Sequence, residues 1–481
     1  MLQKLRNRIA SIPAGVMASM AYTVCSILQR CLSMFTMPLF TRLLTPEQYG
    51  QYNVYLSWMN IFTIFITLNL AYGSFSKAMV TYEKDRHGYI AAVQNVTLLL
   101  AGVFLLLYLP FRNVWNPLLE LPTELVLLMV AEIILQNALL CWYGHRRFTY
   151  QYKSVVAVTL LVALSSPALA LVLVTNAAEK GIARIIGYAV VVIAVGFACF
   201  VYQVIRGKGG IKREYWKYAL SFNIPLIPYY LSQVVFNQSD RIMISHMSGT
   251  DKAGIYSVAY TLATILTFVL NSINGSYVPW FYGKIKEGKG AENKAMANGI
   301  SILMAFLLLG VIALAPEIIA LMAGPGYTEA VWVVPPVAMS LLLLFYAQLF
   351  INVEFYYEQK SLLVWGSIGA AILNVVLNWL LIPIFGFVAA GYTTLASYVV
   401  FAVANYFTLK VIRKRNGVDI DFFRLPALIG IFLTFSALSF LAMSLYTLPL
   451  VRYIIITCVL VAVLIFHKQV RKFLTSVLKR K

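Results

Sequence analysis

The chain has 481 residues, of which 61% are hydrophobic and 12% are charged, whereas a soluble globular protein carries about 25% charged residues. A soluble protein of this composition could not cover its surface, and no segment between the apolar blocks is long enough to bury a core of its own. The formal net charge of +20 does not point to nucleic acid, because the basic residues are confined to short segments between apolar blocks.

Fourteen apolar blocks have the length of about 20 residues that spans a bilayer. Each must be helical, because backbone groups in lipid need hydrogen-bond partners within the segment. The first six expected spans are 13–40, 52–73, 89–109, 123–144, 155–175 and 183–205. The next six are 217–246, 254–282, 297–318, 329–353, 361–383 and 387–410, and 425–446 and 450–467 complete the set. The first block is too long for a signal core and lacks a clear cleavage site, so we interpret it as a permanent helix.

Basic residues predict the orientation of these spans. Of the 38 Lys and Arg residues, 30 fall in segments on the side of the N-terminus, 7 fall on the opposite side, and Arg30 alone lies inside a span. Cytoplasmic loops carry the excess of Lys and Arg in membrane proteins. We therefore predict an even number of spans with both termini cytoplasmic. The segment Lys468–Lys481 is basic and amphipathic, and we expect it to lie on anionic lipid headgroups.

Two short motifs recur with a common offset of 204 residues. The motif Gly-x-Tyr-x-Val occurs at 50–54 and 254–258, and Gly-Tyr occurs at 187–188 and 391–392. The two copies of each motif are six spans apart, and because six is an even number the two halves have the same orientation in the membrane. Such halves are related by a pseudo-two-fold axis along the membrane normal, as in some transporters. We predict a six-helix lobe over 1–210, a second six-helix lobe over 211–415, and two additional helices with a basic tail over 416–481.

Several classes of protein are disfavoured by what the sequence lacks. It contains no phosphate-binding loop for ATP, no repeated filter sequence of a channel, and no external loop large enough for a catalytic domain. The five cysteines have no CxxC spacing and the four histidines are far apart, so we expect neither a metal site nor a resident cofactor. The sequence therefore predicts a protein that is not an enzyme.

Arg30 is the strongest single functional signal. An Arg within a span costs about 2.5–3.5 kcal/mol on insertion scales and should face a cavity or a partner. Ser19, Ser26 and Ser33 share its helical face by spacing. One interpretation is a cationic group that holds an anion such as a pyrophosphate. The alternative is a structural ion pair, with Glu132 of the fourth span as its partner.

The seventh span repeats this pattern of polar residues. Gln233, Asn237 and Arg241 follow one another at intervals of four, so they share one helical face, and Asp240 is adjacent. These residues either contact the substrate or mark the outer membrane interface. Pro225 and Pro228 bend or break the helix near its inner end. Further polar stripes, including Asn374 and Asn378, line a hydrated path or form hydrogen bonds between helices.

These motifs resemble those of a known family. The residues that carry the resemblance are Pro38–Gly50, Phe222–Pro228, Asp240-Arg241, Gly254–Tyr256, Asn374, Asn378, Leu381–Pro383, Gly386 and Gly391-Tyr392. Their order and spacing are similar to the polysaccharide-transport branch of the multidrug/oligosaccharidyl-lipid/polysaccharide exporter superfamily, over nearly the whole chain.

The resemblance implies a flippase in the bacterial inner membrane for undecaprenyl-diphosphate-linked oligosaccharide repeat units of O-antigen, capsule or exopolysaccharide. It implies alternating access between two lobes without ATP, and cavity cations that meet the lipid diphosphate. Arg30 is then the main candidate for substrate binding, with Arg42, Arg241, Gln233 and Asn237 as helpers. Glu132 and Asp240 are candidates for coupling to a proton or sodium gradient. Expected partners are the lipid-linked substrate, membrane lipids and other membrane proteins of polysaccharide assembly.

Three alternatives remain at this stage. A drug or cation antiporter of the same superfamily would depend on buried acids, of which Glu132 is the best placed. A flippase for peptidoglycan precursors or teichoic acids differs only in substrate. A membrane glycosyltransferase or polymerase is disfavoured by the short external loops.

Overall fold

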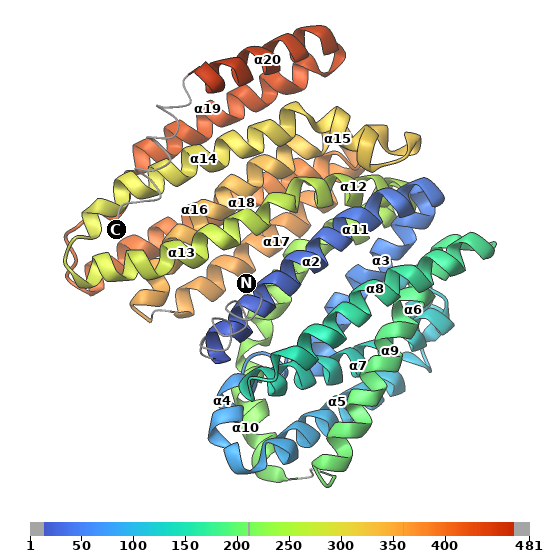
Figure 1. Cartoon of the computed structure of the whole chain (residues 1–481). Helices are drawn as coiled ribbons and strands as arrows, with labels where there is room; N and C mark the ends of the chain where they lie inside the picture. Colours follow the sequence, from blue (N-terminus) through green and yellow to red (C-terminus); the bar gives the residue numbers. More distant parts are fainter. Residues whose placement is uncertain (1–13, 210–211, 359, 466–481) are drawn as a thin grey trace, which may run out of the picture. The chain divides into compact units, whose positions relative to one another are not determined.

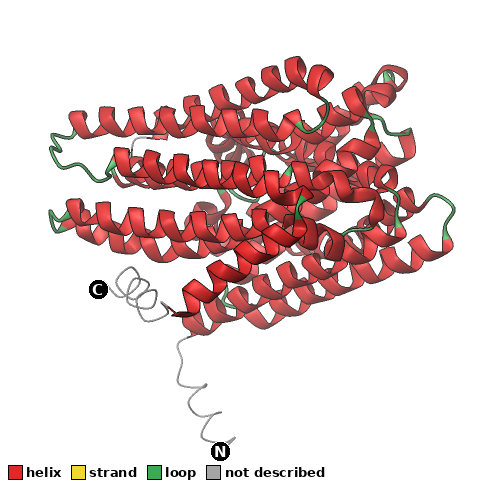
Figure 2. Ribbon diagram, turned by 90° about the horizontal axis from the view of Figure 1, so that it is seen from above, coloured by secondary structure: helices red, strands yellow, loops and turns green. Residues whose placement is uncertain are grey.

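The computed structural model describes residues 14–209, 212–358 and 360–465. Helices joined by short turns make up these ranges, and no strand occurs within them (Figure 2). The predicted all-α membrane fold is therefore confirmed. The tail Lys468–Lys481, for which we expect contact with headgroups, lies outside the described residues.

The helices follow one another with few interruptions (Figure 1). Up to residue 248 they are α2 (Ala14–Leu43), α3 (Pro46–Thr67), α4 (Phe75–Thr81), α5 (Arg86–Tyr108), α6 (Arg112–Leu119), α7 (Thr123–Phe148), α8 (Tyr152–Asn176), α9 (Lys180–Arg206), α10 (Arg213–Asn223) and α11 (Ile227–Ser248). The others are α12 (Thr250–Ala263), α13 (Thr267–Lys286), α14 (Asn293–Ala313), α15 (Ala315–Met322), α16 (Val334–Tyr356), α17 (Lys360–Phe385), α18 (Ala389–Arg415), α19 (Leu425–Ser444) and α20 (Pro449–Ile465).

Each of the fourteen predicted spans corresponds to a helix or to a pair of consecutive helices. In the described ranges, 12 helical segments are long and apolar enough to cross a membrane. The two remaining predicted spans correspond to α3 and α20; α3 is rich in polar side chains, and α20 has 17 residues. A count of about fourteen spans agrees with this set.

The second span begins and ends six residues earlier than predicted. Thr45 accepts a hydrogen bond from the Gln48 backbone N–H while the Gln48 side chain accepts one from the Thr45 N–H, and Pro46 occupies the first turn. This capping box starts the helix within a polar stretch that hydropathy assigns to a loop. The helix stops after Thr67 because Leu68 and Asn69 adopt left-handed conformations, with φ of 47° and 52°.

The seventh span is broken at its two prolines, as predicted. A 3-10 turn over Ile224–Leu226 separates α10 from α11, because Pro225 and Pro228 have no N–H to donate to an α-helix. At the start of α10, the Lys212 ammonium donates to Asp85 (2.5 Å), and this bond raises the pKa of Lys212 above its ordinary value. Asn223, at the other end, donates to the Ser74 hydroxyl (2.7 Å).

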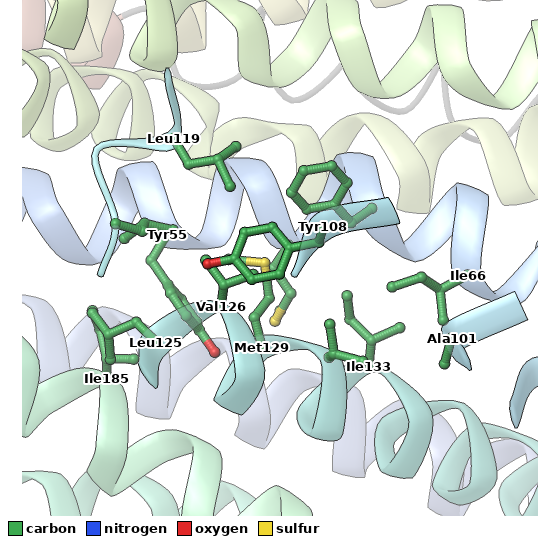
Figure 3. Packing of buried hydrophobic residues seen from close by; sticks show 14 of the residues in the cluster. Tyr55, Ile66, Ala101, Tyr108, Leu119, Leu125, Val126, Met129, Ile133 and Ile185 are labelled. Atoms are coloured by element: carbon green, nitrogen blue, oxygen red, sulfur yellow. The ribbon is translucent and has the colours of Figure 1, made fainter. Parts of the chain in front are cut away.

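The chain forms two compact units, Met1–Gln238 and Ser239–Lys481, and the division falls within α11. In the first unit, apolar side chains of α3, α5, α7 and α9 form one core, which includes Tyr55, Tyr108 and Met129 (Figure 3). In the second unit, α16 is almost entirely buried, since α12, α14, α18 and α19 all pack against it. The division into repeats at residue 210 stays a prediction.

Candidate functional site

Asp240 of α11 is the centre of a buried polar network in the second unit. Its side chain is 2% exposed. The Tyr256 hydroxyl of α12 donates to Oδ2 (2.5 Å), and the Asn378 amide of α17 donates to Oδ1 (2.7 Å). The Thr394 hydroxyl of α18 also donates to Oδ2 (2.8 Å). Four helices therefore meet at one carboxyl group, and each of the three donors offsets part of the cost of burying it.

A second layer of polar groups surrounds these donors. Thr393 donates to Oδ1 of Asn378, and Ser239 donates to Oδ1 of Asn374 (3.2 Å). The Asn374 amide lies 3.4 Å from the Thr394 hydroxyl oxygen. Asn374 and Asn378, which the sequence places in one polar stripe, thus face Asp240. Several amide, hydroxyl and carboxyl oxygens converge here, and oxygen is the ligand type that a proton or a hard cation prefers.

Three further candidates from the sequence, Gln233, Asn237 and Arg241, also lie on α11. The Arg241 guanidinium lies over the ring of Tyr260, with 4.7 Å between its central carbon and the ring centroid. The Asn237 amide donates to the Gln233 carbonyl within the helix (2.7 Å), and both side chains are half-buried. The spacing of these three residues places them on one face of α11, and Asp240 is adjacent to that face.

Glu132 of α7 is the buried acid of the first unit. It is 5% exposed, and the Tyr55 hydroxyl of α3 donates to its Oε2 (2.9 Å). Tyr55 projects among Leu125, Val126 and Met129 of α7, so the pair lies beside the apolar core (Figure 3). Among the described residues this is the one donor to Glu132, and it satisfies only part of a carboxylate, which can accept several hydrogen bonds.

The remaining candidates lie on α2. The backbone of Arg30 belongs to this helix, but its side chain lies outside the described part of the chain, as do those of Ser19, Ser26 and Ser33. The proposed pairing of Arg30 with Glu132 therefore stays a prediction. Arg42 lies in the last turn of α2 and is exposed.

Arg184 of α9 is a buried cation that the sequence analysis missed. Its side chain is 6% exposed. The guanidinium carbon lies 3.9 Å from the ring centroid of Tyr52, and 4.5 Å from those of Phe40 and Tyr49. Nε and Nη1 are buried without a hydrogen-bond partner among the described residues. From the sequence, Arg184 is assigned to a loop because it lies at the start of the predicted span 183–205. The three rings come from α2 and α3, so no pattern near Arg184 in the sequence indicates its burial.

The repeated tyrosine contacts opposite charges in the two units. Tyr52 and Tyr256 occupy the same position of the Gly-x-Tyr-x-Val motif. Tyr52 lies against the buried Arg184 cation, whereas Tyr256 donates to the buried Asp240 carboxyl group. In the ranges that the structure describes, no three His, Cys, Asp or Glu side chains are grouped as a metal site would require.

Long apolar helices with charged groups held inside each unit define a multi-pass α-helical membrane protein. Residues 17–283, more than half of the chain, match the family described as polysaccharide biosynthesis protein. The chain belongs to this family, and the resemblance to the polysaccharide-transport branch is confirmed.

Two proteins of Haemophilus influenzae are similar in sequence. One, named Lsg locus putative protein 1, is 23% identical over 276 residues, which are 56% of this chain and 67% of that protein. The other, an uncharacterized membrane protein, is 23% identical over 281 residues, or 56% of this chain and 66% of that protein. The chain thus spans about two thirds of the length of each relative.

Solved transporter structures have a similar fold. The lipid II flippase MurJ, in its inward closed conformation, superposes with a TM-score of 0.67 at 13% identity, covering 93% of this chain and 99% of MurJ. A multidrug resistance MATE family transporter of the MOP superfamily, in an inward-facing conformation, has a TM-score of 0.61 at 12% identity, covering 82% of this chain and 99% of the transporter. At these identities the similarity concerns the fold.

Proposed function

We propose that the protein is a flippase for lipid-linked oligosaccharide repeat units, which it moves from the cytoplasmic to the outer leaflet of the bacterial inner membrane. Membership in the polysaccharide biosynthesis family carries this proposal, and the fold shared with transporters supports it. O-antigen, capsule and exopolysaccharide units all fit this substrate class. Two lobes that alternate in their access to the two sides would move the head group while the polyprenyl tail stays in lipid.

The substrate presents an anionic diphosphate, which cannot cross hydrocarbon without compensation for its lost hydration. We propose that Arg30 supplies this compensation, because a guanidinium stays charged and can form two parallel bonds with phosphate oxygens. Arg42, Arg241, Gln233 and Asn237 are proposed to contribute further contacts. One or two cations suit a site that must release its ligand as well as bind it.

We propose that a proton or sodium gradient drives the cycle through Asp240 or Glu132. The burial of the Asp240 carboxyl group among polar groups of α12, α17 and α18 supports it as the cation site. If Glu132 is the coupling group instead, Glu132→Gln abolishes the response of transport to a pH gradient. If it is the partner of Arg30, neutralising both residues restores folding and leaves coupling intact.

A transport assay tests the proposed function directly. The purified protein is reconstituted into vesicles that contain undecaprenyl-diphosphate-linked oligosaccharide, and a membrane-impermeant enzyme reports how much oligosaccharide has changed leaflet. We expect transfer above that of protein-free vesicles, and a smaller effect for a polyprenyl monophosphate without sugar. Equal transfer with and without the protein would contradict the proposal.

A drug or cation antiporter is the second candidate, because both units bury an acid of the kind that antiport requires. Under this alternative, cells that express the protein resist cationic dyes, and surface polysaccharide does not depend on it. Unchanged dye resistance together with loss of surface polysaccharide on deletion favours the flippase.

A further inference from the structure

Glu354 of α16 is a buried acid that has no part in the networks described above. Its side chain is 1% exposed, and neither carboxyl oxygen has a hydrogen-bond partner among the described residues. It lies within a helix that is itself enclosed by other helices of the second unit. Asp240 with three donors and Glu132 with one are better satisfied than this group.

Aromatic rings pack against the face of α16 on which Glu354 lies. Phe350 precedes Glu354 by one helical turn and shares its face of α16. The Phe350 ring lies 5.5 Å from that of Tyr406 on α18 and 5.2 Å from that of Phe423 in the segment before α19. This face of α16 therefore points at α18 and at the following connection, and the Glu354 side chain is 1% exposed.

No ion pair joins Glu354 to a described cation at this end of the second unit, and the side chain of Lys360, at the start of α17, lies outside the described part of the chain. On α18, Arg413 pairs with Asp421 and donates to the Asp419 carbonyl, and the exposed Lys410 lies over the rings of Tyr406 and Phe407. On α13, Lys284 pairs with Glu287 and Glu292, and Lys286 is exposed. On α14, Lys294 is half-buried, and α19 contains no charged residue.

The described titratable side chains near the C-terminal end of α16 do not provide a partner for an ionised Glu354 either. Tyr282 of α13 donates to the Asn352 carbonyl (3.0 Å), and its ring packs against that of Tyr356. Tyr357 packs against Tyr356, and Glu358 is exposed and carries the same charge sign. An ionised carboxylate at Glu354 would thus be buried without a hydrogen bond or a described counter-ion, which is among the most costly states a side chain can adopt.

We propose that Glu354 is a proton-binding site: its carboxyl group is protonated in this conformation and releases the proton when water reaches this end of α16. On release the O–H bond breaks, its electron pair stays on the carboxylate oxygen, and the proton passes to a water molecule. The ionised carboxylate is stable only when the helices around Glu354 separate and water can reach it. Binding of the proton therefore favours the packed arrangement of this end of the second unit, and its loss favours an open one.

Infrared spectroscopy of the purified full-length protein tests the site without any transport assay. A protonated carboxylic acid has a carbonyl stretching band distinct from that of a carboxylate. We expect the difference spectrum between wild type and Glu354→Gln at neutral pH to contain one protonated-acid band. The matched control Glu358→Gln removes an exposed acid four residues away and should lose carboxylate absorption instead.

The outcome is decided by which band is lost. Loss of carboxylate absorption in Glu354→Gln would show that the group is ionised and would overturn the proposal. If Glu354→Gln does not fold, Glu354→Asp replaces it: the shorter acid should keep a protonated band at a shifted frequency, and a carboxylate band alone contradicts the site.

A second experiment addresses the use of this proton and rests on the proposed function. Vesicles with a pH gradient are compared with vesicles without one for transfer of the lipid-linked oligosaccharide. We expect a gradient to accelerate wild type and Glu358→Gln several-fold but to leave Glu354→Gln at its basal rate. If a pH gradient still accelerates transfer by Glu354→Gln, Glu354 does not couple transport to the gradient. Absence of transfer by wild type refutes the flippase function, whereas the infrared result on the proton site still holds.

Discussion

Buried acidic and basic side chains are stabilised to different degrees at individual residues. Asp240 receives three hydrogen bonds, Glu132 receives one, and Glu354 has none among the described residues. Arg184 is enclosed by aromatic rings rather than by acids. A charge within a membrane span is retained for a structural or functional reason, because its insertion costs free energy. Substitutions at these positions, with stability and transport measured separately, therefore show whether each residue serves folding or transport.

The first prediction concerns Arg30 and contact with the diphosphate. Arg30→Ala should abolish surface polysaccharide while the protein stays at its normal level in the membrane. Arg30→Lys keeps the charge but loses the two-pronged geometry, so it should retain part of the polysaccharide. Polysaccharide is measured by gel analysis of cell extracts. Normal polysaccharide export in cells that contain Arg30→Ala protein at its normal level would contradict this prediction. Arg30 would then be interpreted as a member of a structural ion pair.

The second prediction concerns the aromatic enclosure of Arg184. Arg184→Lys replaces a planar cation that stacks on three rings by a compact ammonium, so we expect a loss of about 1–2 kcal/mol in the free energy of unfolding. Thermal unfolding of the purified protein in detergent measures the effect. Arg112→Lys, at an exposed position of α6, is the control and should change nothing. Equal stability of both variants would show that the rings do not hold the guanidinium.

At the scale of elements, α9 packs closely against its neighbours through glycines. A methyl group added at Gly187 would lie 2.3 Å from Cα of Ala170 on α8, and one at Gly196 would lie 2.4 Å from the Leu135 carbonyl oxygen on α7. Because both contacts are with backbone atoms, no side chain can rotate to make room. These glycines set how closely α7, α8 and α9 approach one another, as small residues do at helix interfaces in membranes.

The third prediction follows from this packing. Gly187→Val should force α8 and α9 apart and destabilise the first unit by about 1–3 kcal/mol or more, as overpacking does. Gly102→Val is the control, since nothing lies within 4 Å of a methyl group at Gly102 on α5. Fluorescence-detected chromatography after heating measures the remaining folded fraction. A Gly187→Val protein as heat-resistant as the control contradicts the close approach.

At the scale of the whole molecule, the distribution of basic residues predicts topology. Thirty Lys and Arg residues lie in segments assigned to the side of the N-terminus and seven to the other side. Such a bias orients membrane proteins with the basic side in the cytoplasm. Within the second unit, Arg452 of α20 pairs with Glu317 of α15, which attaches α20 to the rest of that unit.

The fourth prediction is that both termini are cytoplasmic. A reporter that is active only outside the cytoplasm should be inactive when fused after His467 and active when fused after Asn176, which we assign to the outer side. A fluorescent reporter that folds in the cytoplasm should give the opposite pattern. External activity of the fusion after His467 would refute an even number of spans.

The sequence by itself determined the class of protein, the all-helical fold and the positions of the spans, because blocks of about 20 apolar residues in lipid have one stable secondary structure. Local chemistry also located the break at Pro225 and Pro228, since proline acts through its own backbone. The ends of the second span needed the capping of Thr45 and the left-handed Leu68, which hydropathy does not register.

Only the tertiary structure decided which polar side chains meet. Asp240, Tyr256, Asn378 and Thr394 come from four helices separated by up to 154 residues, and helical spacing within one segment cannot predict such a meeting. The same holds for Arg184, whose position at the start of a span suggests exposure until α2 and α3 place three rings around it. Periodicity fixes the face on which a residue lies, whereas the packing of other helices decides whether that face meets lipid, water or a partner.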